Sequence, residues 1–263
     1  MRTLHVVIPF YNEPDTIQPC VRRVVDARLG ERWRKQLVIV DDYSDERCRI
    51  LLDSLVRQLR EEGCEVALHR HDVNRGKGAA VSTGFDAVLD AHPPDDDLVI
   101  IQDADLEYDP ADYAQLIEPI IRDEAQAVVG VRWGGHHPTR GFRPRIHRWG
   151  NGLLTMCSNL MTGYRVHDME CCYKVFGVGL LCRLRPWLSE PRFGIEPQIM
   201  AGLSRIGATV AEVPVSYDPR SITAGKKIGW IDGLQAVRVI VRERFRSTTT
   251  PSAGSNESEA RRG

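Results

Sequence analysis

The first half of the chain alternates short apolar runs with segments in which apolar residues recur at helical spacing. The apolar runs predict strands over residues 4–8, 37–40, 66–68, 98–101 and 127–131. Between them, triplets such as Val81, Phe85 and Val88 fall on one face of a helix. Strands that alternate with helices at this spacing are typical of βαβ units and a largely parallel sheet, whose strands are apolar throughout because both faces are covered.

The second half is less regular. It predicts a helix over residues 148–161, strands over 173–176 and 209–215, and a helix over 230–245. The first of these helices is amphipathic, with Trp149, Leu153, Met156 and Leu160 at helical spacing. Residues 247–263 are rich in Ser, Thr, Gly and Glu, a composition that predicts a disordered tail.

Acidic residues follow the ends of three predicted strands. Glu13 comes shortly after the first, Asp41 and Asp42 end the second, and Asp103 and Asp105 follow the fourth. Ligands of open parallel sheets lie beyond the carboxyl ends of the strands. We therefore expect these carboxylates to gather at a ligand-binding edge.

The most informative short motif is Asp103-Ala104-Asp105, with Glu107 two residues further on. Carboxylates are hard oxygen ligands that suit Mg²⁺ or Mn²⁺, which often share their coordination shell with substrate phosphates. Such a cation stabilises the charge on a nucleoside-diphosphate leaving group. The alternative interpretation is a solvated acidic loop.

Residues 74–78, Asn-Arg-Gly-Lys-Gly, open a predicted helix. Glycines let the backbone approach a ligand closely, and a helix N-terminus favours anions. The Walker spacing is absent, which argues against a nucleotide-hydrolysing P-loop. A tight turn before a helix is the alternative.

Composition narrows the class of protein. The 263 residues carry 35 Lys+Arg and 36 Asp+Glu, a balance that predicts no nucleic-acid partner. Seven cysteines without a C-x-x-C spacing favour reduced thiols in a cytoplasmic protein over a disulfide framework or a zinc site. No signal peptide and no apolar run of about 18 residues is found, so an integral membrane protein is not expected, while attachment to a membrane surface stays open.

Four segments resemble, in order and spacing, the signature of family 2 glycosyltransferases: 8–13 (IPFYNE), 40–42 (VDD), 74–78 (NRGKG) and 102–105 (QDAD). Later segments are similar to the dolichol- and polyprenyl-phosphate sugar synthase branch: 148–151, 168–170 with 172–174, 193–197, 217–220 and 225–230. The resemblance extends from residue 4 to about residue 242.

This resemblance implies an α/β GT-A fold, a mostly parallel central sheet flanked by helices. It implies one domain over 1–246, with a nucleotide-binding half (1–132) and an acceptor half (133–246). It also implies a metal-dependent, inverting hexosyltransferase that uses Mg²⁺ or Mn²⁺ and a UDP- or GDP-sugar. The implied acceptor is a polyprenyl phosphate on the cytoplasmic membrane face, reached by a peripheral enzyme.

The same resemblance assigns roles to individual residues. Residues for the donor's base and ribose are Pro9, Tyr11, Glu13, Val40 and Asp42. The residues expected to bind the metal and diphosphate are Asp103, Ala104 and Asp105, and Asp105 is also predicted to be catalytic. Glu107 is expected to lie near the metal. The cations expected to bind phosphate are Arg132, Arg220 and Lys226, because charge-assisted bonds to phosphate are strong, and Lys77 is a further donor-binding residue.

Asp168 is the candidate for a catalytic base or an acceptor-positioning group. A hydroxyl acceptor needs a base to take its proton, whereas a phosphate acceptor is already anionic and needs only positioning. The alternative is that Asp168 caps a helix or pairs with Arg165 or Lys174.

One position departs from the family pattern. The family often has Asp-Asp-Gly-Ser after its second strand, and this chain has Tyr43 in place of the glycine. Tyrosine adopts a positive φ poorly, so the geometry of this turn is an open question.

Three other functions compete with this reading. One is a glycosyltransferase with a soluble sugar, natural-product or protein acceptor, for which Asp168 is a true base. The second is a non-catalytic nucleotide-sugar-binding protein. The third is a nucleotidyltransferase, although the N-terminal Gly-rich loop expected there is missing. The apolar stripe that begins at Trp149 is either core packing or membrane contact, and the arginines near the C-terminus are either a solvated face or a site for anionic headgroups.

Overall fold

A seven-stranded sheet forms the centre of the protein, in the order β3-β2-β1-β4-β6-β5-β7. The computed structural model describes residues 1–132, 142–220 and 230–246. The strands are β1 (Arg2–Phe10), β2 (Trp33–Asp41), β3 (Glu65–Arg70), β4 (Leu98–Ile101), β5 (Ala127–Val131), β6 (Lys174–Gly177) and β7 (Val210–Pro214). The interior strands are buried along nearly their whole length, as their continuous apolar sequences predict.

The strands are mostly parallel, and the predicted α/β class is confirmed. β1 pairs in parallel with β2 and β4, β2 with β3, and β5 with β7. β6 is the exception, because it lies between β4 and β5 and runs antiparallel to both. Its short apolar run was predicted as a strand, but its direction was not.

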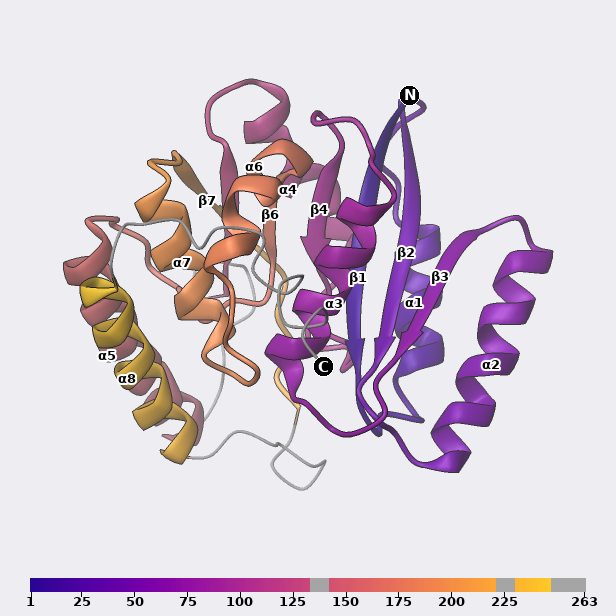
Figure 1. Cartoon of the computed structure of the whole chain (residues 1–263), viewed down its shortest axis with the longest axis horizontal. Helices are drawn as coiled ribbons and strands as arrows, with labels where there is room; N and C mark the ends of the chain where they lie inside the picture. Colours follow the sequence, from indigo (N-terminus) through magenta and orange to yellow (C-terminus); the bar gives the residue numbers. More distant parts are fainter. Residues whose placement is uncertain (133–141, 221–229, 247–263) are drawn as a thin grey trace, which may run out of the picture.

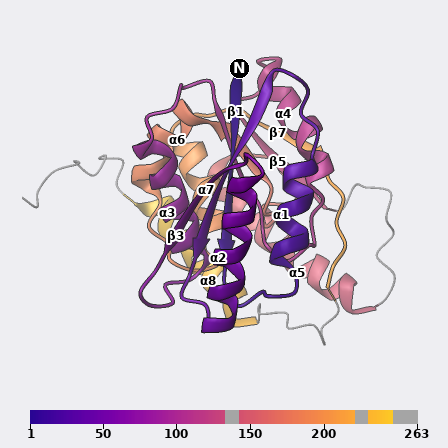
Figure 2. The same ribbon diagram turned by 90° about the vertical axis from the view of Figure 1, so that its right-hand side faces the viewer.

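Helices cover both faces of the sheet. They are α1 (Ile17–Asp26), α2 (Glu46–Glu61), α3 (Lys77–Asp90), α4 (Tyr113–Ile121), α5 (Phe142–Thr162), α6 (Val178–Leu184), α7 (Ile195–Arg205) and α8 (Trp230–Phe245), with short 3-10 turns η1 (Pro110–Asp112) and η2 (Arg185–Trp187). Helices α1 and α4 lie on one face, and α3 and α6 lie on the other (Figure 2). Helices α5 and α8 pack side by side at one end of the molecule (Figure 1).

Most predicted helices are confirmed, but α6 and α7 were missed. The signal for α7 is present, since Ile195, Ile199 and Leu203 recur every four residues and are fully buried. In the described part of the chain, no helix is both long enough and apolar enough to cross a bilayer.

The topology predicts a ligand site at the carboxyl ends of β1 and β4. The chain first steps outward from β1 to β2 and β3, and α3 then carries it back across β1 to β4. The strand order therefore reverses between β1 and β4, which is where ligands bind in open α/β sheets. Gly84 lets α3 lie close to β1, because a Cβ there would be 2.3 Å from Val7 Cγ1.

Candidate active site

The loops that follow β1 and β2 are tied together at this edge. The backbone N–H of Asn12 donates to Ser44 Oγ at 3.0 Å, and the N–H of Asp45 donates to Asn12 Oδ1 at 2.8 Å. Asn12 takes a left-handed conformation, with φ of 49°, which its short amide side chain tolerates. The two loops are thus held together at one side of the predicted ligand site.

Asp42 organises the loop before α3. Its carboxylate is buried and accepts hydrogen bonds from the N–H of Arg75 at 2.8 Å, the N–H of Gly76 at 2.7 Å and His71 Nδ1 at 2.6 Å. Both oxygens therefore hold protein donors. A contact from Asp42 to a donor's base or ribose stays a prediction.

Tyr43 adopts the backbone that the family's usual glycine would take. Its φ is 66°, and its ring is half exposed, with the guanidinium carbon of Arg49 at 4.9 Å from the ring centroid. The turn is therefore kept despite the tyrosine, and the stacked arginine offsets part of the backbone strain.

The glycines at the start of α3 meet protein rather than open space. A Cβ on Gly76 would lie 2.5 Å from the carbonyl oxygen of Pro191, and a Cβ on Gly78 would lie 2.1 Å from that of Glu190. The N–H of Ala79 also donates to the carbonyl of Pro191 at 2.9 Å. We expected these glycines to let a ligand approach the backbone. In the structure they instead let the backbone of residues 190–192 approach.

Lys77 links the first aspartate of the Asp-x-Asp motif to α7. Its Nζ lies 2.9 Å from the carboxylate of Asp103 and 2.8 Å from Glu196 Oε1. Burial lowers the pKa of Lys77, but the attraction of Asp103 and Glu196 outweighs it and raises that pKa well above its ordinary value. Lys77 is thus a charged bridge at the predicted ligand site.

The backbone at Asp103 is fixed by a buried amide. Gln102 Oε1 accepts hydrogen bonds from the hydroxyls of Tyr113 at 2.6 Å and Tyr173 at 2.8 Å. Gln102 Nε2 donates to the carbonyl of Asp103 at 2.9 Å. This network holds the motif at the end of β4.

Arg220 joins three of the predicted acidic residues. Its guanidinium contacts Glu13 Oε2 at 2.8 Å and Asp105 Oδ2 at 3.2 Å, and its backbone N–H donates to Glu107 Oε1 at 3.0 Å. Burial, then repulsion from Asp103 and Glu107, raises the pKa of Asp105 to about 7. Arg220 acts in the opposite direction but does not outweigh these effects.

Asp168 lies elsewhere on this edge, fully buried against Arg132. It accepts from Arg132 Nε at 2.7 Å, Nη2 at 2.7 Å and the backbone N–H at 3.0 Å. The proposed partners Arg165 and Lys174 were wrong, because Lys174 donates instead to the carbonyls of Met169 at 3.0 Å and Cys171 at 2.5 Å.

Most of the predicted residues lie at the ends of β1, β2 and β4. Those that the structure describes there are Pro9, Tyr11, Glu13, Val40, Asp42, Asp103, Ala104, Asp105 and Glu107, joined by Lys77 from the start of α3 and by Arg220. Lys226 lies outside the described residues. Among the described residues, no three His, Cys, Asp or Glu side chains are arranged to hold a metal ion, so the metal-ligand set stays a prediction.

Sequence reasoning missed two acidic residues beside this site, Glu170 and Glu196. Glu196 has 4% exposure and contacts Lys77, and Glu170 is close enough to be repelled by Glu196. Both lie in segments that resemble the family, 168–170 and 193–197, but no role was predicted for either residue. Glu196 is carried by α7, a helix that was not predicted, so its place beside Lys77 could not be expected from the sequence.

The sheet order and the acidic edge at its reversal define a GT-A fold of the glycosyltransferase class. The chain belongs to glycosyl transferase family 2, whose family model matches residues 5–183.

Named relatives and solved structures agree with this assignment. The dodecaprenyl-phosphate galacturonate synthase of Rhizobium johnstonii is 26% identical over 224 residues, which are 82% of this chain and 59% of that protein. The UDP-N-acetylglucosamine–dolichyl-phosphate N-acetylglucosaminyltransferase of Methanococcus voltae is 24% identical over 237 residues, 86% of this chain and 91% of that protein. Glucosyl-3-phosphoglycerate synthase of Mycobacterium tuberculosis, solved with Mn²⁺ and UDP-glucose, superposes with a TM-score of 0.61 at 19% identity, covering 96% of this chain and 81% of that one.

Proposed function

We propose that this protein is an inverting glycosyltransferase that moves a hexose from a UDP- or GDP-sugar to a polyprenyl phosphate. The observation that carries the proposal is the partly buried acidic edge at the sheet reversal, where Lys77 contacts Asp103 and Arg220 contacts Asp105. Alternating carboxylates and cations suit a metal-bound diphosphate. The names of the two relatives above support a lipid-phosphate acceptor.

A divalent ion suits the carboxylates of this edge. Asp103, Asp105 and Glu107 supply the hard oxygen atoms that Mg²⁺ and Mn²⁺ prefer. Burial, then repulsion from Asp103 and Glu107, raises the pKa of Asp105, and a bound cation would favour its ionised form. When bound, the ion stabilises charge on the leaving diphosphate, and Lys77 and Arg220 add fixed positive charge beside it.

The burial and hydrogen bonds of Asp168 favour a phosphate acceptor over a hydroxyl acceptor. Its carboxylate is fully buried and already accepts three hydrogen bonds from Arg132. A general base must reach the proton that it abstracts. Asp168 is better suited to holding Arg132 in place, and an acceptor that is already anionic needs no base.

Helices α5 and α8 form the surface that we assign to the membrane. On α5, Trp149, Leu153, Met156 and Leu160 are exposed, Trp149 to 81%. The sequence of α5 contains no acidic residue. Helices with an apolar stripe, a tryptophan and basic character lie in the interface of anionic bilayers.

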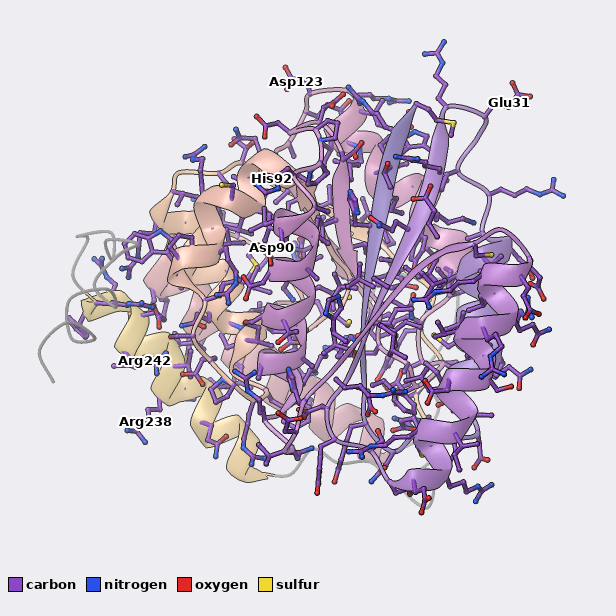
Figure 3. All side chains as sticks on the ribbon, turned by 45° about the vertical axis from the view of Figure 1, so that its right-hand side comes forward. Glu31, Asp90, His92, Asp123, Arg238 and Arg242 are labelled. Atoms are coloured by element: carbon purple, nitrogen blue, oxygen red, sulfur yellow. The ribbon has the colours of Figure 1, made fainter. Side chains whose placement is uncertain are left out.

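Helix α8 adds basic and apolar side chains to this surface. Arg238 and Arg242 extend from its outer side (Figure 3). Val241 and Phe245 are exposed on the same helix, and a pocket of about 490 Å³ beside it is lined by Ser189, Arg242, Phe245 and Arg246. Arginines beside apolar side chains suit lipid headgroups and chains together.

Liposome flotation tests the membrane assignment. Wild-type protein should float with vesicles that contain phosphatidylglycerol and much less with neutral vesicles. The double variant Trp149→Ser, Leu153→Ser should lose most of this binding, whereas Ile50→Ser, at an exposed position on α2, should keep it. Absence of binding to anionic vesicles, with or without acceptor lipid, would refute the assignment.

Turnover assays test the reaction. With Mn²⁺ and a panel of UDP- and GDP-sugars, we expect transfer to a polyprenyl phosphate and loss of transfer on chelation or in Asp105→Ala. Transfer to soluble sugars alone would favour the soluble-acceptor alternative. Donor binding without transfer or hydrolysis would favour the non-catalytic one.

A further inference from the structure

Two buried carboxylate oxygens, one of them on the glutamate that contacts Lys77, accept no hydrogen bond from any residue that the structure describes. They are Glu170 Oε1 and Glu196 Oε2. Buried polar atoms almost always have a partner, and leaving a charged one without a partner costs free energy. Two such atoms therefore indicate a place where a hydrogen-bond donor from outside the chain binds.

These oxygens adjoin the proposed diphosphate site. Lys77 Nζ lies 2.9 Å from Asp103 and 2.8 Å from Glu196 Oε1, so one ammonium group separates Glu196 from the Asp-x-Asp motif. The turn that carries Glu170 lies beside the same motif, since Cys172 Sγ donates to the carbonyl of Ile101, the last residue of β4, at 3.7 Å. Burial and then repulsion from Glu196 raise the pKa of Glu170 to about 7, which agrees with this placement. A ligand held at Asp103 thus extends naturally toward this pair.

The backbone around both residues is held firmly. The buried ammonium of Lys174 donates to the carbonyls of Met169 and Cys171, on either side of Glu170. Glu196 lies in the first turn of α7. The two carboxylates are therefore presented by a fixed turn and a helix end, as a preorganised site requires.

The charge of the pair selects the chemistry of its ligand. Carboxyl oxygens without a donor accept hydrogen bonds from the hydroxyls of a ligand, in the ionised and in the protonated form, whereas carboxylates repel phosphate. The donor's diphosphate and a lipid phosphate are thus poor ligands for Glu170 and Glu196. A neutral group that carries several hydroxyls, attached to a diphosphate at Asp103, is a good one.

From this geometry we infer that Glu170 and Glu196 bind hydroxyl groups of the hexose carried by the donor and so determine which sugar is transferred. The inference rests on the proposed function and adds the residues that recognise the sugar. A site built to hydrogen-bond a hydroxyl discriminates strongly against a substrate that lacks it, because its buried polar groups are then left without partners.

Calorimetric titration separates recognition of the sugar from binding of the nucleotide. Affinities are measured with Mn²⁺ for UDP against UDP-glucose and UDP-N-acetylglucosamine, and for GDP against GDP-mannose. For the best donor, the ratio of sugar-nucleotide affinity to bare-nucleotide affinity is compared between wild type, Glu170→Gln and Glu196→Gln. Glu61→Gln, at an exposed position on α2, is the matched control.

We expect the ratio to fall about tenfold or more in Glu170→Gln, the range for losing a hydrogen bond to a charged group, with bare-nucleotide affinity unchanged. Glu196→Gln should lower the ratio too and, by loosening Lys77, also weaken the bare nucleotide. Urea denaturation checks that each variant is folded. An unchanged ratio in a folded Glu170→Gln variant overturns the inference while leaving the proposed function intact. Failure of the wild type to bind any of these nucleotides overturns both.

Discussion

Arg132 Nε and Nη2 each lie 2.7 Å from an oxygen of the Asp168 carboxylate, forming a two-pronged ion pair in which Asp168 is fully buried. The ring of Tyr217 lies against the same guanidinium, with its centroid 5.3 Å from the guanidinium carbon. This pair joins the end of β5 to the turn before β6. It therefore links the part of the site built by the first half of the chain to the part built by the second.

Asp168→Asn should lower the free energy of unfolding by about 3–5 kcal/mol, because it leaves the Arg132 charge buried without its partner. Urea denaturation measures this, with the exposed Asp123→Asn as a control that should change little. Turnover with a phosphate acceptor should be reduced but retained. Unchanged stability together with abolished turnover would instead identify Asp168 as a catalytic base.

Gly78→Ala should destabilise the protein by more than about 2 kcal/mol. The added Cβ would lie 2.1 Å from the carbonyl oxygen of Glu190, and a backbone atom cannot move aside as a flexible side chain can. Gly152→Ala is the matched control, since it lies in α5 with nothing within 4 Å, and it should stabilise its helix by about 0.5–1 kcal/mol. Thermal unfolding of both variants gives the comparison, and equal effects would contradict the packing argument.

Tyr43→Gly should be more stable than Tyr43→Ala by about 1–2 kcal/mol. Both variants lose the contact with Arg49, but only glycine relieves the left-handed backbone, whose φ is 66°. The difference between the two variants thus isolates the strain, which chemical denaturation can measure. Equal stabilities would show that the turn relaxes to another conformation when the tyrosine is removed.

The first half of the fold could be predicted from the sequence because its strands are covered on both faces. Such strands are uninterrupted apolar runs, and the predicted ranges for β4 and β5 match the structure to the residue. The direction of β6 could not be predicted, since a four-residue strand carries no local signal for its partners. The acidic strand ends meet because the strands that carry them are parallel neighbours.

The pairing of charges within the site could not be predicted in the same way. Lys77 was assigned to the donor and Arg220 to its phosphates, and in the structure they contact Asp103 and Asp105. Arg220 and Asp105 are 115 residues apart in sequence, and only the tertiary fold decides that they meet. The motif thus identified the chemistry of the site, whereas packing determined which cation meets which carboxylate.

The pH dependence of stability should change in Glu170→Gln. In the folded wild type, burial and Glu196 raise the pKa of Glu170 from 4.5 to about 7, while Lys174 and Arg132 act in the opposite direction. Because the folded state holds this proton more tightly, Glu170 contributes stability below pH 4.5 that is lost as the pH rises through 7.

Glutamine removes that titration, so the variant and wild type should differ little at pH 4, and the variant should be more stable by up to about 3 kcal/mol at pH 8. Urea denaturation across this range measures the difference, in which groups shared by both proteins largely cancel. Glu61→Gln should show no such growth with pH, because Glu61 is exposed on α2. A difference that stays constant between pH 4 and 8 would mean that Glu170 ionises normally, and the crowding of Glu170 against Glu196 would then be absent in solution.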